Sequence, residues 1–152
     1  MLKLLRENLF LLVTAYVVVL IQLAIFSHFM DFEANFILAS ICVSSVLLEF
    51  EFNFIFLAFL ALVMQSFVYD SQFLWYLPGL ALLLKLINTD EIKNPLWLTI
   101  LYSVILTLII NLFDSSSLAY SAKLWKTVPA NIVLASVLYL VTNYFYANKP
   151  RR

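Results

Sequence analysis

The sequence predicts an all-α membrane protein, folded as one bundle of six transmembrane helices. Hydrophobic residues make up 64% of the 152-residue chain and charged residues 12%, whereas soluble domains average about 45–50% and about 25%. A chain this short cannot hide so much apolar surface in one aqueous core. Apolar runs such as Val17–Ile21 and Val104–Ile110 do not alternate apolar and polar residues, so they lack the pattern of membrane barrel strands.

Six apolar segments follow one another within a single membrane domain that covers residues 1–152. A helix needs about 20 apolar residues to cross the hydrocarbon core, with a range of about 17–25. The first, fifth and sixth segments fit this length, while the second, third and fourth are short and are expected to tilt or to stop below one face. The expected spans are residues 8–29, 32–48, 52–69, 73–87, 96–113 and 128–146.

The breaks between the segments carry turn chemistry. The stretch "EFEFN" (Glu49–Asn53) alternates apolar and polar residues for a few steps between the second and third segments, and we interpret it as an interfacial turn. Pro95 suits the start of the fifth helix. The longest connection is Asp114–Pro129, in which Leu118–Trp125 could form a short helix on the membrane surface.

Positive charge predicts the orientation of the bundle. With the amino terminus in the cytoplasm, six crossings leave two basic residues outside, Lys123 and Lys126. This asymmetry is the one that the positive-inside rule describes, so we expect a multi-pass protein of the bacterial inner membrane with both termini cytoplasmic. The basic residues then inside are Lys3, Arg6, Lys85, Lys93, Lys149, Arg151 and Arg152.

Catalytic and metal-binding patterns are missing from the sequence. Gly79 is the single glycine, which excludes a glycine-rich phosphate loop. One cysteine (Cys42) and one histidine (His28) cannot form a Cys/His zinc site. No ionisable residue falls near the middle of an expected span, which disfavours ion-coupled transport. We therefore expect a protein that is not an enzyme and has no catalytic residue, cofactor or metal; its zero net charge suggests no nucleic-acid partner.

A few uncharged polar residues fall inside the expected spans. An unpaired amide costs several kcal/mol in hydrocarbon, so these side chains should point into the bundle or at a partner helix. They either fix the packing by hydrogen bonds between helices, or form a docking seam for another membrane protein or the lining of a ligand pocket. The candidates are Gln22, Ser40, Ser44, Gln65, Asn111 and Asn131.

Four stretches resemble a known bacterial family. They are "VVVLIQLAIF" (Val17–Phe26), "FEANFILASICVSSVL" (Phe32–Leu47), "LAFLALVMQ" (Leu57–Gln65) and "TVPANIVLASVLYLV" (Thr127–Val141). Together they are similar to the helices of the rod shape-determining protein MreD family, whose members have six short spans. The similarity extends over nearly the whole chain with weakly specific motifs. The chain departs from the family's usual pattern at Ala34, Ala61 and Gln65, where a proline, glycines and an aspartate are common.

The resemblance implies a non-enzymatic inner-membrane scaffold of the cell-elongation machinery that regulates cell shape through peptidoglycan synthesis. Its partners would be membrane lipid, the bitopic protein MreC and the wall-elongation complex. The family is also thought to share its fold with substrate-binding subunits of energy-coupling-factor transporters. The alternative is therefore a subunit that binds a vitamin-like molecule at the outer ends of the spans, lined by Trp125, Tyr120 and His28.

Overall fold

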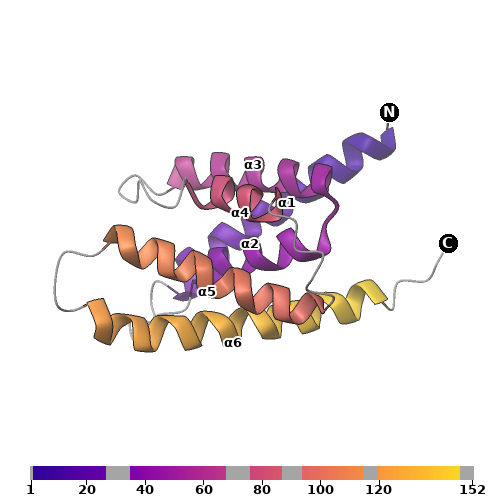
Figure 1. Ribbon diagram of the computed structural model, residues 1–152. Helices are drawn as coiled ribbons and strands as arrows, with labels where there is room; N and C mark the ends of the chain where they lie inside the picture. The colour runs from indigo at the N-terminus through magenta and orange to yellow at the C-terminus, as the bar shows by residue number, and fades with distance from the viewer. Residues whose placement is uncertain (1, 27–34, 68–75, 87–93, 115–119, 148–152) are drawn as a thin grey trace.

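The computed structural model describes residues 2–26, 35–67, 76–86, 94–114 and 120–147. Over these ranges the chain is helical and contains no strand, so the predicted all-α class is confirmed. Six α-helices and one π-helical turn follow in order (Figure 1): α1 (Leu2–Ile21), η1 (Gln22–Phe26), α2 (Phe36–Leu47), α3 (Phe50–Phe67), α4 (Tyr76–Leu86), α5 (Pro95–Asp114) and α6 (Tyr120–Ala147).

The turn between α2 and α3 is shorter than predicted. Helix α3 begins at Phe50, so most of "EFEFN" is already helical. The amide of Asn53 donates to the carbonyl of Glu49 over 2.9 Å, which closes the first turn of α3. Because only Leu48 and Glu49 lie between the helices, interpreting Glu49–Asn53 as an interfacial turn was wrong for its last residues.

The predicted surface helix at Leu118–Trp125 is also wrong as a separate element. Helix α6 starts at Tyr120 and continues without a break through Pro129 to Ala147, 28 residues in all. A proline inside a helix removes one backbone hydrogen bond. Here α6 packs along α5 (Figure 1), and tertiary packing of this kind can hold a helix straight past such a defect. The start of α5 at Pro95 is confirmed.

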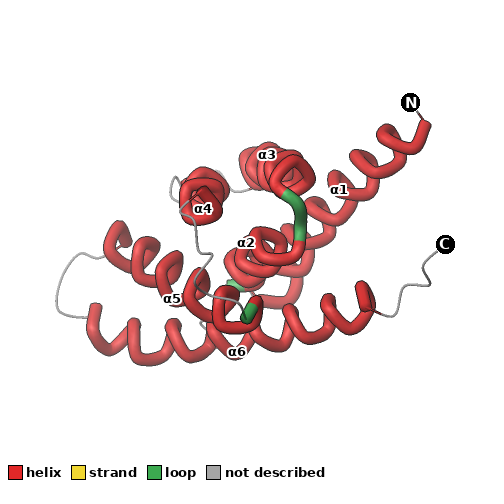
Figure 2. The backbone as a smooth tube through the Cα atoms, turned by 45° about the vertical axis from the view of Figure 1, so that its right-hand side comes forward, coloured by secondary structure: helices red, strands yellow, loops and turns green. Residues whose placement is uncertain are grey.

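Helix α2 is the centre of the molecule. It packs against every other helix, as the view in Figure 2 shows. Its nine residues from Ile37 to Ser45 are all buried. With 12 residues and a rise of 1.5 Å per residue, α2 is about 18 Å long, well short of the roughly 30 Å of a hydrocarbon core. The largest buried side chains around it come from α1, α3 and α5 and include Val19, Leu57, Leu60, Met64 and Leu106.

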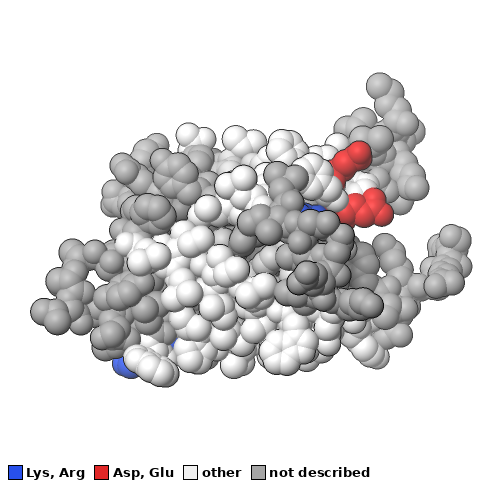
Figure 3. Space-filling model, viewed as in Figure 1, with Lys and Arg blue, Asp and Glu red and all other residues white. Residues whose placement is uncertain are grey.

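The start of α1 and the end of α6 lie at the same end of the molecule (Figure 1). Figure 3 shows a wide uncharged surface between charged groups near the two ends. The structure describes the side chains of four charged residues, and each of them lies near a helix end or a turn: Glu49, Glu51, Lys85 and Lys126.

One stretch within the described residues is long and apolar enough to cross a membrane, Trp125–Phe145 in α6. The other apolar helical stretches there are 10–17 residues long: Asn8–Ala24, Phe36–Leu47, Phe50–Gln65 and Pro95–Ile110. Six helices are therefore present, while six membrane crossings remain a prediction.

Candidate functional site around the central helix

The amino-terminal end of α2 is partly buried in the bundle, where its first backbone amides need acceptors. The first turn of any helix leaves N–H groups without partners in the helix itself. Asn35 is the N-cap residue, and its side-chain Oδ1 accepts a hydrogen bond from the amide of Leu38 over 3.0 Å. This is the usual capping arrangement, and it satisfies one of these amides.

Side-chain amide groups from two other elements accept hydrogen bonds from the backbone N–H groups of Phe36 and Asn35. Gln22, the first residue of η1, accepts from the amide of Phe36 through Oε1 over 2.6 Å. Asn131 of α6 accepts from the amide of Asn35 through Oδ1 over 2.7 Å. The Nδ2 group of Asn131 donates in turn to Oγ1 of Thr107 in α5 over 3.1 Å. We call Gln22, Asn35, Thr107 and Asn131 the polar junction; it links four elements at one end of α2.

The π-helical turn places Gln22 in this junction. Five residues, Gln22–Phe26, are wound as a π-helix at the end of α1. A π turn bonds residue i to i+5, so it changes the direction of the side chains relative to a continuous α-helix, and such turns are frequent at functional positions. Here its first residue meets the start of α2.

At the carboxyl-terminal end of α2, a lysine side chain hydrogen-bonds a backbone carbonyl. The Nζ atom of Lys85, in the last turn of α4, donates a hydrogen bond to the carbonyl of Leu48. The amide of Leu48 donates back to the carbonyl of Ser44 over 2.9 Å. A positive charge at a helix carboxyl terminus is favourable because the last carbonyls are unpaired and carry partial negative charge.

Four residues have a buried side-chain polar atom with no hydrogen-bond partner among the described residues: Asn8 of α1, Ser45 of α2, Asn53 of α3 and Ser103 of α5. Asn53 is fully buried, and both its Oδ1 and its Nδ2 are unpaired. An unsatisfied buried group costs about 1–3 kcal/mol. The two ends of α2 thus differ in how completely the polar groups around them are paired.

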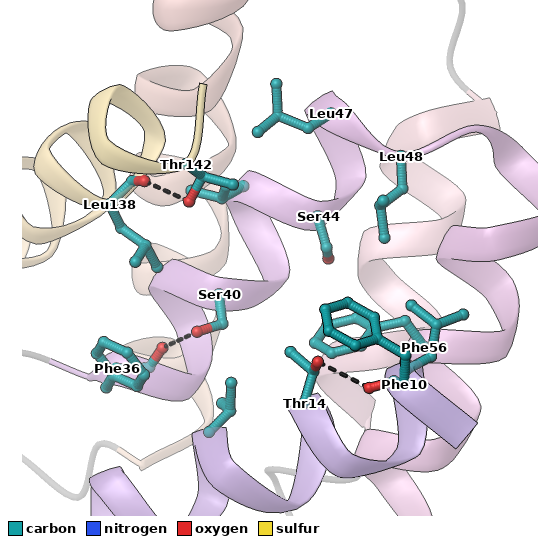
Figure 4. A pocket seen from close by; sticks show the side chains of 13 residues that line it. Phe10, Thr14, Phe36, Ser40, Ser44, Leu47, Leu48, Phe56, Leu138 and Thr142 are labelled. Atoms are coloured by element: carbon teal, nitrogen blue, oxygen red, sulfur yellow. Dashed lines mark hydrogen bonds between the residues drawn. The ribbon is translucent and has the colours of Figure 1, made fainter. Parts of the chain in front are cut away.

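A pocket of about 260 Å³ lies between α1, α2 and α6, with one residue contributed by α3 (Figure 4). The close-up shows α2 as one wall, with α1 and the carboxyl-terminal half of α6 on either side of it. Nearly all of its lining atoms are apolar. The lining consists of Phe10, Leu11, Thr14, Val18, Phe36, Ser40, Val43, Ser44, Leu47, Leu48, Phe56, Leu138 and Thr142.

The hydroxyl groups in this lining are all engaged with their own helices. Thr14 donates to the carbonyl of Phe10 over 2.8 Å and Thr142 to that of Leu138 over 2.7 Å. Ser40 donates to Phe36 over 2.8 Å and Ser44 to Ile41 over 3.0 Å. Each hydroxyl has one hydrogen to donate, so the pocket offers a ligand no free hydroxyl donor.

The structure brings the predicted site residues together in two groups. Gln22 and Asn131 meet in the polar junction, and Ser40 and Ser44 lie on the pocket wall. Gln65 is exposed on α3, apart from both. Asn111 belongs to α5, but its side chain lies outside the described residues.

The structure describes one of the three side chains expected to line a vitamin pocket. Trp125 is 82% exposed on α6, while the side chain of Tyr120 and all of His28 lie outside the described residues. The described pocket is instead near the other end of α6, at Leu138 and Thr142.

Sequence reasoning missed several residues of the junction and the pocket. Asn35 directly precedes an apolar helical run, which is a recognisable N-cap signal. Thr14 and Thr142 carry no such signal, because a threonine in an apolar helix usually bonds its own backbone. The sequence predicts for Lys85 only a cytoplasmic location, as one of the basic residues that orient the bundle.

Among the side chains that the structure describes, no three His, Cys, Asp or Glu residues are grouped to hold a metal ion. Comparisons of the chain with protein-family models, with curated proteins and with solved structures found no match.

Proposed function

We propose that this chain is a multi-pass protein of the bacterial inner membrane that acts as a non-enzymatic scaffold. Its six helices form one bundle in the membrane with both termini cytoplasmic, the short α2 and α4 stopping below one face, and its exposed helix faces dock the single span of a bitopic partner. The resemblance to the MreD family suggests the partner's class, an MreC-like protein of the wall-elongation machinery.

The observation that carries this proposal is the surface of α6. The 21-residue stretch Trp125–Phe145 has a mean hydropathy of 1.5, yet only 17% of its most apolar window is buried. The core helix of a soluble protein would be mostly covered by its own chain. Large apolar surface left uncovered needs either lipid or another protein, and this helix is long enough to lie across a bilayer.

Exposed apolar side chains on α6 define the proposed docking face. We call Val133, Val137, Leu140, Val141 and Tyr144 the α6 outer face; all are exposed. Lipid tails are as apolar as these side chains, so association would depend on close packing rather than on a hydrophobic gain. The branched valines give a stiff, ridged surface that suits such packing.

The hydrogen bonds of the polar junction change the expected docking mechanism. Gln22 and Asn131 bond the start of α2, and Ser40 and Ser44 bond their own helix. These four residues therefore support the bundle from inside. Of the six predicted interface residues, Gln65 is the one whose described side chain is exposed, and it could add a polar contact to a partner.

Coexpression with a tagged MreC-like partner tests the proposal. The wild-type chain should pellet with membranes after carbonate extraction and copurify with the partner in mild detergent. The double variant Val133→Trp/Val137→Trp should reduce partner recovery at least tenfold, because bulky rings disrupt the packing of the α6 outer face. Leu83→Trp, at an exposed apolar site on α4, is the matched control and should stay within twofold of wild type.

Two results would contradict the proposal at different levels. A chain that stays in solution without detergent would rule out the membrane location. A membrane-bound chain that never recovers the partner, or that loses it equally with both variants, would rule out docking on α6 while leaving the membrane location intact.

A further inference from the structure

We propose that the pocket between α1, α2 and α6 binds one acyl chain of phosphatidylethanolamine, whose ammonium group is held by the carboxylates of Glu49 and Glu51 beyond the end of α2. This inference rests on the membrane location proposed above and needs no protein partner. Four observations support it: the shape of the pocket, its hydrogen bonding, the half of the bundle in which it lies, and the charges of the described side chains at its end.

The pocket is long and narrow. Its lining includes both Phe36, the first residue of α2, and Leu48, the C-cap residue of the same helix, and the helix rises about 18 Å between them. The pocket volume of about 260 Å³, spread over about 18 Å, corresponds to a cross-section of roughly 14 Å². A helix with its side chains is about 10–12 Å wide, so it cannot enter, whereas a thin flexible hydrocarbon chain can.

The hydrogen bonds of the lining favour hydrocarbon over a polar ligand. Sites for small polar molecules combine apolar walls with a few polar groups aimed at the ligand. Here the four hydroxyl groups all donate their hydrogens to carbonyls of their own helices: Thr14, Ser40, Ser44 and Thr142. A vitamin-like molecule with several acceptors would lose bonds to water on entering, whereas an acyl chain has none to lose.

The pocket is continuous with the outer surface in one half of the bundle. Phe10, one of its lining residues, is 66% exposed, and exposed apolar side chains flank it, for example Val13 on α1 and Val141 on α6. Its lining residues on α6, Leu138 and Thr142, belong to the end of that helix, which lies at the same end of the molecule as the start of α1 (Figure 1). In the orientation proposed above this end is cytoplasmic, so a lipid of the cytoplasmic leaflet can insert a chain from the side.

Two carboxylates lie at this end of the pocket among the described side chains. Glu49 directly follows the lining residue Leu48, Glu51 lies in the first turn of α3, and both side chains are exposed. Figure 3 shows acidic side chains gathered at the end of the molecule where α1 begins and α6 ends. An ammonium group donates charge-assisted hydrogen bonds to carboxylates. The described charges therefore complement a headgroup that carries an ammonium group.

A positive charge lies at the same turn. The Nζ atom of Lys85 donates to the carbonyl of Leu48, and an ammonium group has three hydrogens to donate. The turn thus presents both signs of charge, which matches a zwitterionic headgroup with its ammonium toward Glu49 and Glu51 and its phosphate toward Lys85. Phosphatidylcholine carries the same two charges, but its quaternary nitrogen has no N–H group to donate. Phosphatidylglycerol has no ammonium group and would place a net negative charge beside two carboxylates.

Native mass spectrometry of the full chain tests this inference. The protein is released from detergent micelles that contain equal amounts of phosphatidylethanolamine, phosphatidylcholine and phosphatidylglycerol with identical acyl chains. One phosphatidylethanolamine should stay bound per chain, in at least threefold preference over each of the other two lipids. Thr142→Phe fills the pocket and should lower this occupancy at least fivefold. Val141→Phe changes a side chain of nearly the same size outside the lining and should stay within twofold of wild type.

A second variant separates the headgroup from the chain. Glu49→Gln/Glu51→Gln removes both carboxylate charges and should lower the preference for phosphatidylethanolamine at least threefold, with phosphatidylcholine retention unchanged. Its control is Lys126→Gln, a charge change near the start of α6 at the opposite end of that helix from the pocket, and this variant should keep the preference within twofold. If Thr142→Phe fails to fold, Thr14→Phe with Val13→Phe as its control tests the same pocket from α1.

Several outcomes would overturn the inference. Equal retention of the three lipids by the wild type, or a preference for phosphatidylglycerol, would remove the role of the two carboxylates. Equal loss in Thr142→Phe and Val141→Phe, or no loss in either, would remove the pocket. If Thr142→Phe kept its lipid but lost the MreC-like partner, the pocket would hold a partner side chain instead. The lipid measurement contains no partner, so a membrane-bound chain that retains no lipid would contradict this inference alone and leave docking on α6 intact.

Discussion

The two ends of the central helix α2 contrast sharply in their hydrogen bonding. At the amino-terminal end, three side chains accept from three partly buried backbone amides, those of Asn35, Phe36 and Leu38. Around the carboxyl-terminal half, Lys85 bonds one carbonyl, yet the side chains of Ser45 and Asn53 are buried and unpaired. The difference indicates that one end fixes the bundle while the other tolerates imperfect packing.

This contrast has a physical basis in the membrane location that we propose. A helix that ends inside hydrocarbon must have its terminal groups paired within the protein. The junction meets this requirement for the start of α2. At the other end, the turn at Leu48 and Glu49 reaches the exposed surface, so its backbone groups need fewer partners within the protein. Mutations should therefore act differently at the two ends.

Asn131→Leu should have the largest effect, a destabilisation of about 2–4 kcal/mol. It leaves the amide of Asn35 without its acceptor and removes the bond to Thr107. The estimate combines about 1–3 kcal/mol for an orphaned group with about 1 kcal/mol for the lost bond. Reversible unfolding by SDS in mixed micelles measures it. Asn143→Leu, exposed on the same helix, should change stability by less than about 0.5 kcal/mol; equal effects would refute a special role for the junction.

Gln22→Leu should destabilise the protein by about 1–2 kcal/mol, because one acceptor of the junction is lost. The matched control is Gln65→Leu, an identical change at an exposed position of α3. The control should be neutral or slightly stabilising in detergent. The same unfolding measurement applies, and a Gln65→Leu variant as unstable as Gln22→Leu would mean that the two amides do not differ as described.

Asn53→Leu should act in the opposite direction and stabilise the fold by about 1 kcal/mol. It replaces an unpaired buried amide with an apolar side chain of similar size. The midpoint of SDS unfolding should rise. A loss of more than about 1 kcal/mol would show that the amide is paired in the membrane-embedded protein, and the contrast between the two ends of α2 would then disappear.

Gly79→Ala should give the smallest effect, a stabilisation of about 0.5 kcal/mol. Gly79 lies inside α4, the helix that carries Lys85, and a Cβ added there meets no described atom within 4 Å. Alanine is a better helix former than glycine because the unfolded chain loses less freedom. Thermal unfolding with a precision of about 1 °C can detect this shift. A destabilised variant would indicate that Gly79 contacts a part of the chain outside the described residues.

The helical elements could be predicted from the sequence because apolar runs are long and their breaks are polar. The segment around Phe36–Leu47 is an example, since Asn35 caps it and Glu49 follows it. The exact turns were harder to predict. Apolar and polar residues alternate over Glu49–Asn53, which predicted a turn, but the amide of Asn53 bonds the carbonyl of Glu49 as α3 begins. Pro129 predicted a helix start, but it lies within α6, which its neighbours support.

The candidate site could be predicted only in part. The cost of burying an amide correctly indicated that Gln22 and Asn131 need partners. Their shared partner, the start of α2, was not predictable because Asn35 and Asn131 are 96 residues apart in the chain. The pocket depends on the gap between α1 and α6, which no local pattern of residues encodes.

The bond between Asn35 and Asn131 also constrains biosynthesis. The ribosome synthesises α2 well before α6, so the backbone amide of Asn35 has no Asn131 acceptor until residue 131 has been made. In the membrane location proposed here, a nascent chain cut off before residue 131 would keep this end of α2 exposed to lipid or to the insertion machinery. The last helix synthesised thus supplies a hydrogen bond that stabilises the start of α2. We therefore expect the chain through α6 to be more stable than fragments that lack α6.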